Sequence, residues 1–320
     1  MSKTKKHSKA LLICIIIALI VAVAITILIG YDYFKFHSRP DAVLHANADV
    51  GYIVSDKTNL DIDIDAYQAF VYDAKTERII YLKGEEKIVY PASTTKLITI
   101  LTALEYLSPE EIVTPTDELT LVEDGSSIAY IRSNHRVSVE MLIEGMLIPS
   151  GNDAAYVLAA AAGRKIKNDA SLSGKDAVVV FVEEMNAYGK KIGLCGSHFT
   201  APDGYYNDDH YTTLEDMIII SKLAVDNELI TRYACLASDD VTYASGETNT
   251  WINTNEMLDK DSKYYNKYVT GLKTGSSDNN YCLVSTVTDG NDSYIVGVFA
   301  SKTKEGRFED TQKIIDKLFK

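Results

Sequence analysis

Short stretches with the β-strand pattern lie near both ends of the chain. Residues 66–72 and 77–82 are rich in β-branched and aromatic side chains, and the turn-prone residues 73–76 separate them. Two strand-like runs joined by a short turn predict a β-hairpin. Towards the C-terminus the same pattern recurs three times between groups of Gly, Asn and Asp. The antiparallel strands predicted there are residues 267–273, 281–287 and 294–300.

Between these strands the apolar residues return every three or four positions, which is the spacing of one helix face. One helix is expected to begin near Ser93 and to end at Ser108-Pro109. Residues 178–182 would suit a buried strand, but apolar positions continue to Ile192 at intervals of four and three, which favours a helix. Further helices are predicted at residues 139–147, 153–162, 214–226 and 308–319.

The order of these elements predicts the fold class. Strands at both ends with helices between them indicate an α+β fold, in which the N-terminal hairpin joins the C-terminal strands in one antiparallel sheet. With 46% apolar residues among 320, the chain can bury a sizeable core. Two local details are also expected: Gly163 ends the helix at residues 153–162, and residues 125–131 contain short strand-like pieces.

Residues 10–30 form a separate hydrophobic segment. These 21 residues carry no charge, and four lysines precede them. A helix of this length spans the roughly 30 Å hydrocarbon core of a bilayer. The basic flank predicts a cytoplasmic N-terminus. The alternative is a cleaved signal peptide, whose apolar region is usually only about 7 to 15 residues long. We therefore expect an uncleaved, single-pass membrane anchor.

This anchor sets the expected domain organisation. We expect a cytoplasmic basic tail at residues 1–9, the transmembrane anchor at residues 10–30 and an extracellular tether at residues 31–62. One folded domain at residues 63–320 would then lie outside the cytoplasm, at the cell membrane.

Charge and cysteine content narrow the class of protein. From residue 40 on, the chain holds 26 basic and 44 acidic residues, a formal charge of −18, so nucleic acid is a poor candidate partner. Outside the hydrophobic segment there are three cysteines. An odd number scattered through a large domain does not suit a disulfide framework, and we expect buried free thiols. They are Cys195, Cys235 and Cys282.

Ser93 is followed three residues later by Lys96, at the start of a predicted helix. Residues at this spacing share a helix face, so the amine can reach the hydroxyl. A neighbouring amine activates a serine as a nucleophile when burial or a second cation lowers the pKa of that amine. The spacing alone is weak evidence because it occurs twice more. The other pairs are Ser2 with Lys5 and Ser301 with Lys304.

Two further motifs can place polar groups near this nucleophile. Ser150-Gly151-Asn152 lies at the break between two predicted helices. Lys273-Thr274-Gly275 lies at the end of a predicted strand, where glycine allows close approach of another backbone or a ligand. Each motif alone is an ordinary turn, cap or strand end. In the order SxxK, SxN and KTG they match the signature set of serine penicillin-binding proteins and class A β-lactamases.

The chain therefore resembles the serine D-alanyl-D-alanine carboxypeptidases, the low-molecular-mass penicillin-binding proteins. The matching blocks are spread in the family's order over about residues 65–320. They are PASTTK followed by LITILTALE, LIPSGNDAA, HFTAPDG with HYTTLEDM, and GLKTG. The resemblance implies a penicillin-binding or β-lactamase-like transpeptidase fold, with an antiparallel sheet flanked by helices and a helical subdomain. It also makes residues 63–320 the catalytic domain.

The resemblance implies a role for each motif residue. Ser93 would attack the carbonyl between two D-alanines, with Lys96 as its base, and release the terminal D-alanine. Ser150 would pass a proton to the leaving amine. The backbone amides of Ser93 and Ser276 would form the oxyanion hole. The substrate-binding residues implied in this way are Asn152, Lys273, Thr274, Gly275, Ser276 and Arg307.

Within this set, the resemblance gives Lys273 two tasks. Its charge would attract the substrate carboxylate and would keep Lys96 less basic. Thr274 would hydrogen-bond that carboxylate, Asn152 would hold the peptide amide, and Arg307 lies where family members carry an arginine for the terminal carboxylate.

The expected partners are peptidoglycan stem peptides, β-lactam antibiotics as covalent inhibitors, and the cytoplasmic membrane; no cofactor is expected. His135, His198 and His210 are expected to be structural, because the family does its chemistry without histidine and no zinc-ligand spacing such as HExxH occurs.

Two alternatives stay open. One is a class A-like β-lactamase, although no Glu-x-x-Leu-Asn segment follows Asn152 at a plausible place. The other is a non-catalytic module that senses penicillin or peptidoglycan.

Overall fold

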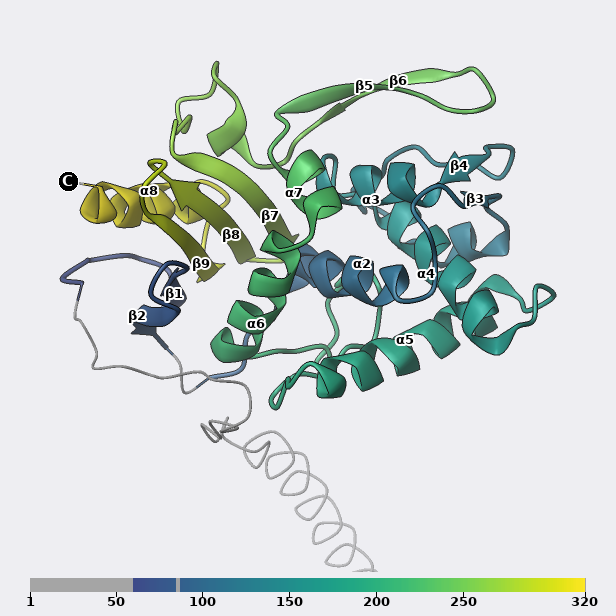
Figure 1. Ribbon diagram of the computed structural model, residues 1–320, viewed down its shortest axis with the longest axis horizontal. Coiled ribbons are helices and arrows are strands. Elements are labelled where there is room, and N and C mark those ends of the chain that lie inside the picture. The colour runs from purple at the N-terminus through teal and green to yellow at the C-terminus, as the bar shows by residue number, and fades with distance from the viewer. Residues whose placement is uncertain (1–59, 85–86, 320) are drawn as a thin grey trace, which may run out of the picture. The chain divides into compact units, whose positions relative to one another are not determined.

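A five-stranded antiparallel sheet lies beside a helical lobe in the computed structural model, which describes residues 60–84 and 87–319 (Figure 1). The strands are β1 (Gln68–Asp73), β2 (Arg78–Lys83), β7 (Val269–Ser277), β8 (Asn280–Thr288) and β9 (Ser293–Ser301). Their order across the sheet is β2-β1-β9-β8-β7. The N-terminal hairpin thus joins the C-terminal strands through the β1–β9 pair, which confirms the predicted topology, and β7 is a free edge.

The β1–β9 pair depends on a glycine opposite an aromatic ring. Phe70 pairs with Gly297, and a Cβ at Gly297 would lie 2.2 Å from a ring carbon of Phe70. The ring therefore lies across the β9 backbone, where a larger residue would leave no room for it.

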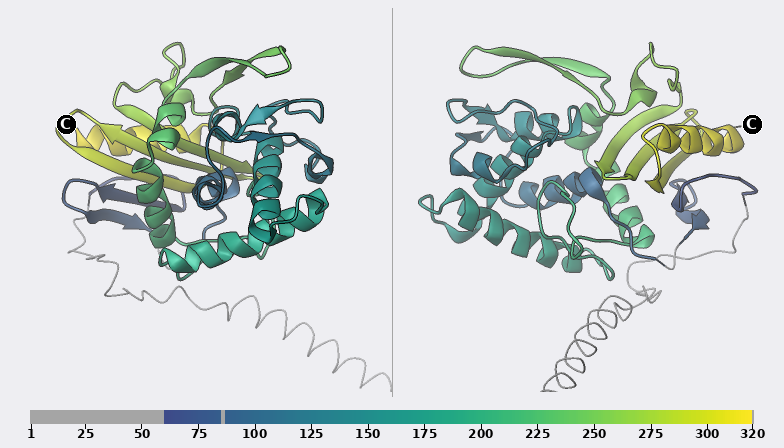
Figure 2. Two further views of the ribbon diagram at one scale, coloured as in Figure 1. Left: turned by 45° about the vertical axis from the view of Figure 1, so that its right-hand side comes forward. Right: turned by 180° about the vertical axis from the view of Figure 1, so that it is seen from behind.

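The sheet separates two hydrophobic cores. Phe308, Ile314 and Ile315 of α8 (Gly306–Leu318) pack on one face of the sheet. On the other face, α2 (Lys96–Leu104) and α6 (Leu214–Val225) belong to a larger core that includes Phe70 and Phe299 of the sheet. Successive strand residues point to opposite faces, so β1 and β9 contribute to both cores. Figure 2 shows the sheet between these helices.

A helical lobe extends the larger core away from the sheet (Figure 2). Helices α4 and α5 pack closely together, and α2 contacts both of them. This lobe matches the expected helical subdomain. Its helices are η1 (Ala92–Thr95), α3 (Val139–Leu147), α4 (Asn152–Lys167), α5 (Gly174–Lys191) and η2 (Asp117–Leu121), and α7 (Glu228–Ala234) and η3 (Glu256–Leu258) follow along the chain. Two small antiparallel pairs are β3 (Ile112–Val113) with β4 (Val137–Ser138), and β5 (Ser238–Thr242) with β6 (Thr248–Ile252).

The predicted strand pieces at residues 125–131 and the predicted burial of all three cysteines were wrong in detail. Residues 125–131 form no strand; the backbone amides of Ala129 and Ile131 donate to the side chain of Asp153 instead of to a sheet. The free state of the three cysteines is confirmed, but Cys195 and Cys235 are exposed and Cys282 alone of the three is buried.

The predicted membrane anchor at residues 10–30 lies outside the described residues, as does most of the predicted tether. Within residues 60–84 and 87–319, no helix is both long enough and apolar enough to cross a bilayer. The anchor therefore stays a prediction.

Helix α4 continues past Gly163, where the sequence predicted its end. It ends instead at Lys167, followed by Asn168 in the left-handed conformation. Gly163 serves helix packing, because a Cβ there would lie 1.9 Å from the carbonyl oxygen of Ala177 in α5. The absent side chain lets the two helices approach closely.

We expect Gly163→Ala to lower the free energy of unfolding by about 1 to 3 kcal/mol, the usual cost of overpacking a core. Gly189→Ala in α5 is the matched control, because its Cβ would meet only side-chain atoms, at 3.2 Å from the end of Leu194 and 3.8 Å from the end of Ile98. Alanine also favours a helix over glycine by up to about 1 kcal/mol. Urea denaturation of the full chain, followed by circular dichroism, measures both changes. Equal stability of the Gly163→Ala protein and the native protein would contradict this account of the α4–α5 contact.

Candidate active site

The predicted nucleophile lies in a tight turn at the start of α2. Ser93 belongs to the short helix η1, and Lys96 is the first residue of α2, one turn further on. Thr94 closes the turn by donating from its backbone amide and its hydroxyl to the carbonyl of Pro91. As the helical spacing predicted, Lys96 Nζ reaches Ser93 Oγ, at 2.9 Å.

The Lys96 amine is held by three hydrogen bonds from three segments of the chain. Besides Ser93 Oγ, it donates to Asn152 Oδ1 at 2.8 Å and to the backbone carbonyl of Asp203 at 3.1 Å. The side chain is fully buried, and this burial lowers the pKa of Lys96 to about 8, while the carboxyl groups of Asp203 and Asp153 act in the opposite direction. At pH 7 a minority of the amine, roughly a tenth, is therefore neutral and able to accept a proton, far more than for an ordinary lysine.

The second lysine lies on the edge strand β7. Lys273 Nζ donates to Ser150 Oγ at 2.9 Å and to the carbonyl of Thr274 at 3.0 Å. Burial lowers the pKa of Lys273 well below its ordinary value, and the charges of Lys96 and then Arg307 lower it further. Burial is the largest cause of the lowered Lys96 pKa. The two lysines interact, because the Lys96 charge lowers the Lys273 pKa, and a contribution of the Lys273 charge to the Lys96 shift stays a prediction.

Ser150 and Asn152 come from the break between α3 and α4. Ser150 has a left-handed backbone, with φ at 62°, which is uncommon for a residue other than glycine. Gly151 next to it cannot be larger, because a Cβ there would lie 2.7 Å from that of Ala129. Asn152 opens α4 and donates from Nδ2 to Ser126 Oγ at 3.0 Å. The sharp turn brings the Ser150 hydroxyl to Lys273 and the Asn152 amide to Lys96.

Gly275 brings the edge strand against the turn that carries the nucleophile. A Cβ at Gly275 would lie 2.7 Å from the Pro91 carbonyl oxygen and 3.2 Å from the backbone nitrogen of Ser93. This close approach explains why the motif needs glycine at its third position. It also places the neighbouring residues of β7, Thr274 and Ser276, beside the nucleophile.

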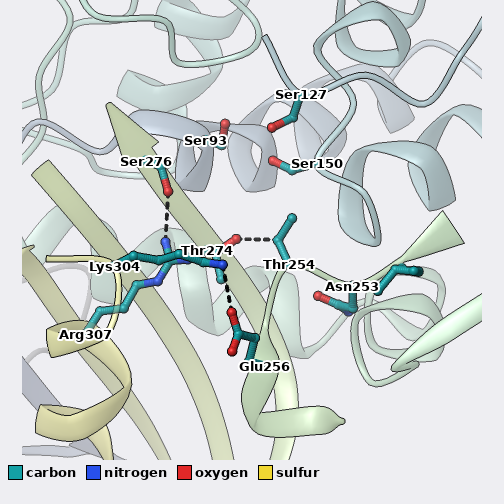
Figure 3. A pocket seen from close by; sticks show the side chains of 11 residues that line it. Ser93, Ser127, Ser150, Asn253, Thr254, Glu256, Thr274, Ser276, Lys304 and Arg307 are labelled. Carbon is teal, nitrogen blue, oxygen red and sulfur yellow. Dashed lines mark hydrogen bonds and ion pairs between the residues drawn. The ribbon is translucent and has the colours of Figure 1, made fainter. Parts of the chain in front are cut away.

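These residues surround a pocket of about 430 Å³ (Figure 3). Lys96, Lys273 and Asn152 are buried directly behind it, in contact with hydroxyl groups at the surface of the site. Figure 3 shows the hydroxyls of Ser93, Ser127 and Ser150 on one side and charged side chains on the other. The lining residues are Ser93, Ser127, Ser150, Ile252, Asn253, Thr254, Glu256, Thr274, Ser276, Lys304 and Arg307.

Arg307 reaches this pocket from α8, on the far side of the sheet. Its Nη1 donates to the Gly275 carbonyl and to Ser276 Oγ, both at 2.9 Å. The side chain is 1% exposed, and its Nε has no hydrogen-bond partner among the described residues. Burial lowers the pKa of Arg307 to about 10, so it remains a cation at neutral pH. A buried guanidinium at the end of a pocket favours an anionic ligand there.

The sequence did not predict the role of Asp153, whose carboxylate holds the segment at residues 125–131 as one wall of the site. Both carboxylate oxygens of Asp153 accept backbone amides of the 125–131 segment, at 2.8 Å from Ala129 and from Ile131. The side chains of Tyr243 and Trp251 both donate to the Ala129 carbonyl. This wall carries Ser126 and Ser127. The one available signal was an acidic residue in the first turn of a predicted helix, which is too common to assign a role.

The histidines hold loops together. Thr200 donates its amide to Nδ1 of His210, so Nε2 carries the proton and donates to Thr95 Oγ1 at 2.9 Å. Burial lowers the pKa of His210 to about 3, so it is neutral. His198 contacts the carbonyl of Asp209, and His135 lies 2.8 Å from Glu247. These contacts agree with the structural roles expected from the sequence.

A serine hydroxyl in contact with a buried lysine amine, beside a cationic pocket, defines an active-serine enzyme of the acyl-transfer class. A family described as D-alanyl-D-alanine carboxypeptidase, Peptidase S11, matches residues 54–303. The chain belongs to this family, which confirms the resemblance drawn from its motifs.

Known members of the family are similar over most of this chain. D-alanyl-D-alanine carboxypeptidase DacF of Bacillus subtilis is 28% identical over 260 residues, which cover 80% of this chain and 62% of that protein. The Streptomyces K15 DD-transpeptidase structure has a TM-score of 0.71 at 28% identity and covers 80% of this chain and 98% of its own. Penicillin-binding protein D2 of Listeria monocytogenes, solved in an ampicillin-bound form, has a TM-score of 0.64 at 27% identity, with the same coverage.

We expect the rate of acylation by a fluorescent penicillin to rise with pH and to level off above about 8, because neutral Lys96 must accept the Ser93 proton. Lys273→Met keeps the bulk of the side chain and removes its charge. This variant should react more slowly, with its midpoint still near 8, because burial sets the Lys96 pKa. Stopped-flow labelling across pH 5 to 10 measures both profiles. A midpoint moved towards 10.5, the ordinary lysine value, would show that the Lys273 charge, and not burial, lowers the Lys96 pKa.

Proposed function

We propose that this protein is a membrane-anchored serine carboxypeptidase that removes the terminal D-alanine from peptidoglycan pentapeptides. One observation carries the proposal. The Ser93–Lys96 pair faces a pocket of about 430 Å³ with a buried arginine on its other side. A peptide that ends in a free carboxylate fits such a site, with its last peptide bond at the serine and its carboxylate towards the cation.

In the proposed reaction, Ser93 Oγ bonds to the carbonyl carbon of the penultimate D-alanine while Lys96 accepts the hydroxyl proton. The C–N bond then breaks, and the nitrogen leaves as the amine of free D-alanine. Ser150, in contact with Lys273, is placed to supply the proton that this nitrogen takes up. Water next attacks the ester carbon, the bond to Ser93 Oγ breaks, and the serine regains its proton.

Two backbone amides are available for the negative charge that develops on the carbonyl oxygen. Ser93 contributes one, and Ser276 on β7 contributes the other, because Gly275 lets the strand approach within about van der Waals contact of the Ser93 nitrogen. In other acyl-transfer enzymes, loss of one such donor costs about 3 kcal/mol of transition-state stabilisation.

The substrate carboxylate has three groups to bind it. The hydroxyls of Thr274 and Ser276 line the pocket, and the Arg307 guanidinium lies directly behind Ser276. Thr274 Oγ1 contacts Thr254 Oγ1 at 2.5 Å, which fixes its orientation. A charge-assisted contact with Arg307, or with Lys273 once the carboxylate favours its protonated form, would position the scissile bond over Ser93.

We also propose that β-lactams acylate Ser93. A β-lactam carries a strained amide and a carboxylate at a spacing similar to that of a terminal dipeptide, and the Listeria relative was solved in an ampicillin-bound form. The membrane anchor at residues 10–30, with residues 63–320 outside the cytoplasm, belongs to the same proposal and rests on the uncharged segment and its basic flank.

The full chain in detergent should release D-alanine from diacetyl-lysyl-D-alanyl-D-alanine and should be labelled covalently by a fluorescent penicillin. Ser93→Ala should abolish both activities, because no acyl-enzyme can form. Chromatography of free D-alanine and in-gel fluorescence are the measurements. Labelling without release of D-alanine would favour a penicillin-sensing module, and rapid turnover of a chromogenic cephalosporin would favour a β-lactamase.

Cells that express the full chain should retain it in the membrane pellet after alkaline carbonate washing, because an uncleaved transmembrane helix is not extracted. Protease added to cells that have lost their cell wall but keep an intact cytoplasmic membrane should degrade the domain that carries Ser93, because this domain is expected outside that membrane. A soluble product shortened at the N-terminus would instead indicate a cleaved signal peptide.

A further inference from the structure

An ion pair lies on the wall of the pocket opposite the serines. Lys304 Nζ and Glu256 Oε1 are 2.7 Å apart, and both side chains line the same pocket as Ser93 and Thr274. Figure 3 shows the serine hydroxyls on one side and the Lys304–Glu256 pair on the other. The side chains are 53% and 36% exposed, so the pair lies at the mouth of the pocket.

The two residues come from segments that are each fixed in place. Glu256 begins η3, which is capped by the Asn255 side chain and anchored by buried Met257. Lys304 lies in the turn between β9 and α8, where the Gly306 amide donates to Thr303 Oγ1. The ion pair therefore joins two anchored segments across the end of the pocket.

Glu256 offsets part of the positive charge at this end of the pocket. Arg307 and Lys304 are cations that face the proposed position of the substrate carboxylate, and Glu256 is the anion that lines the pocket with them. Its charge acts on Arg307 as well, raising the pKa of that residue against the effect of burial. Glu256 thus lowers the attraction of this end for anions and holds Lys304 across it.

The end that binds the terminal carboxylate is also the end from which the leaving amine departs. By microscopic reversibility, an amine that attacks the acyl-enzyme must enter along the path by which D-alanine leaves. The Streptomyces K15 relative is named both as a carboxypeptidase and as a DD-transpeptidase, two reactions that differ in whether water or an amine takes the acyl group. The width of this end therefore bears on which reaction follows acylation.

We propose that the Glu256–Lys304 bridge closes the leaving-group end of the pocket to anything larger than a single amino acid. This inference rests on the proposed carboxypeptidase function and specifies it: the acyl-enzyme is passed to water, and cross-linked peptides are poor substrates. Water attacks the ester carbon, and the Ser93 Oγ–C bond breaks. With a bulky amine the same step would form an amide and move one proton from the amine to Ser93.

The test measures how the acyl-enzyme is divided between water and two amines in the full-length protein in detergent. Diacetyl-lysyl-D-alanyl-D-alanine is the donor, isotope-labelled D-alanine is the small acceptor, and a stem tetrapeptide with a free side-chain amine is the bulky acceptor. Glu256→Gln and Lys304→Met each remove the bridge. Each should raise transfer to the bulky acceptor, relative to hydrolysis, by about three- to fivefold, the scale of an exposed ion pair. Transfer to D-alanine should stay within about twofold.

The same two variants should affect donor binding in opposite directions, which a merely structural role would not produce. Glu256→Gln leaves Lys304 free for the substrate carboxylate and should lower KM. Lys304→Met removes a cation and should raise it. The charge-reversed double variant, Glu256→Lys with Lys304→Glu, restores a bridge and should return the bulky acceptor to the native low rate.

A matched control is available among ion pairs that do not line the pocket. Lys191 and Glu105 form an exposed ion pair at 2.8 Å, with side chains 68% and 44% exposed, and neither lines the pocket. Glu105→Gln should change neither partition nor KM. If both bridge variants release D-alanine normally and transfer no more acyl group to the bulky acceptor than the native protein does, the proposed role of the bridge is wrong and the proposed function still stands. A native protein that releases no D-alanine would overturn both.

Discussion

The structure depends on keeping one ammonium group out of water. Lys96 is fully buried, and its three hydrogen bonds lead to the Ser93 hydroxyl, the Asn152 amide and the Asp203 carbonyl. An isolated buried lysine is costly, and here three hydrogen bonds satisfy the protons of the ammonium form while burial lowers its pKa to about 8. The positions of α2, α4 and the loop before Gly204 are therefore fixed by the needs of this one side chain, and the nucleophile is activated as a result.

Close backbone approach supplies the second constraint. Gly275 lets the edge strand touch the turn before Ser93, and Gly204 does the same from another side, since its Cβ would lie 1.9 Å from the Ala92 carbonyl oxygen. The turn is thus clamped between two glycines. Ala92 itself has a left-handed φ of 47°, a strained conformation of the kind found where a surrounding structure determines the backbone around a functional residue.

The sequence predicted what short-range patterns determine. Strand alternation and helical spacing located the sheet, its topology and the Ser93–Lys96 contact, and the motif set brought Ser150, Asn152 and Lys273 to the same site. It could not predict what depends on distant partners. The packing role of Gly163, the Asp153 contacts and the burial that tunes Lys96 all arise from other segments of the chain. Lys304 belongs to an SxxK pair whose serine ends strand β9 and does not open a helix.

The pairing of β1 with β9 has a consequence for how the protein reaches its active form. The sheet joins residues near 70 to residues near 297, and the Asp310 carboxylate accepts the Ala66 amide across 244 positions. The Lys273–Ser150 hydrogen bond likewise spans 123 positions. Contacts so distant in sequence form late and slowly during folding. The pocket, and the burial that lowers the Lys96 pKa, therefore form only after almost the whole chain has been made, so a partly synthesised chain has the serine and its lysine but no reactive site.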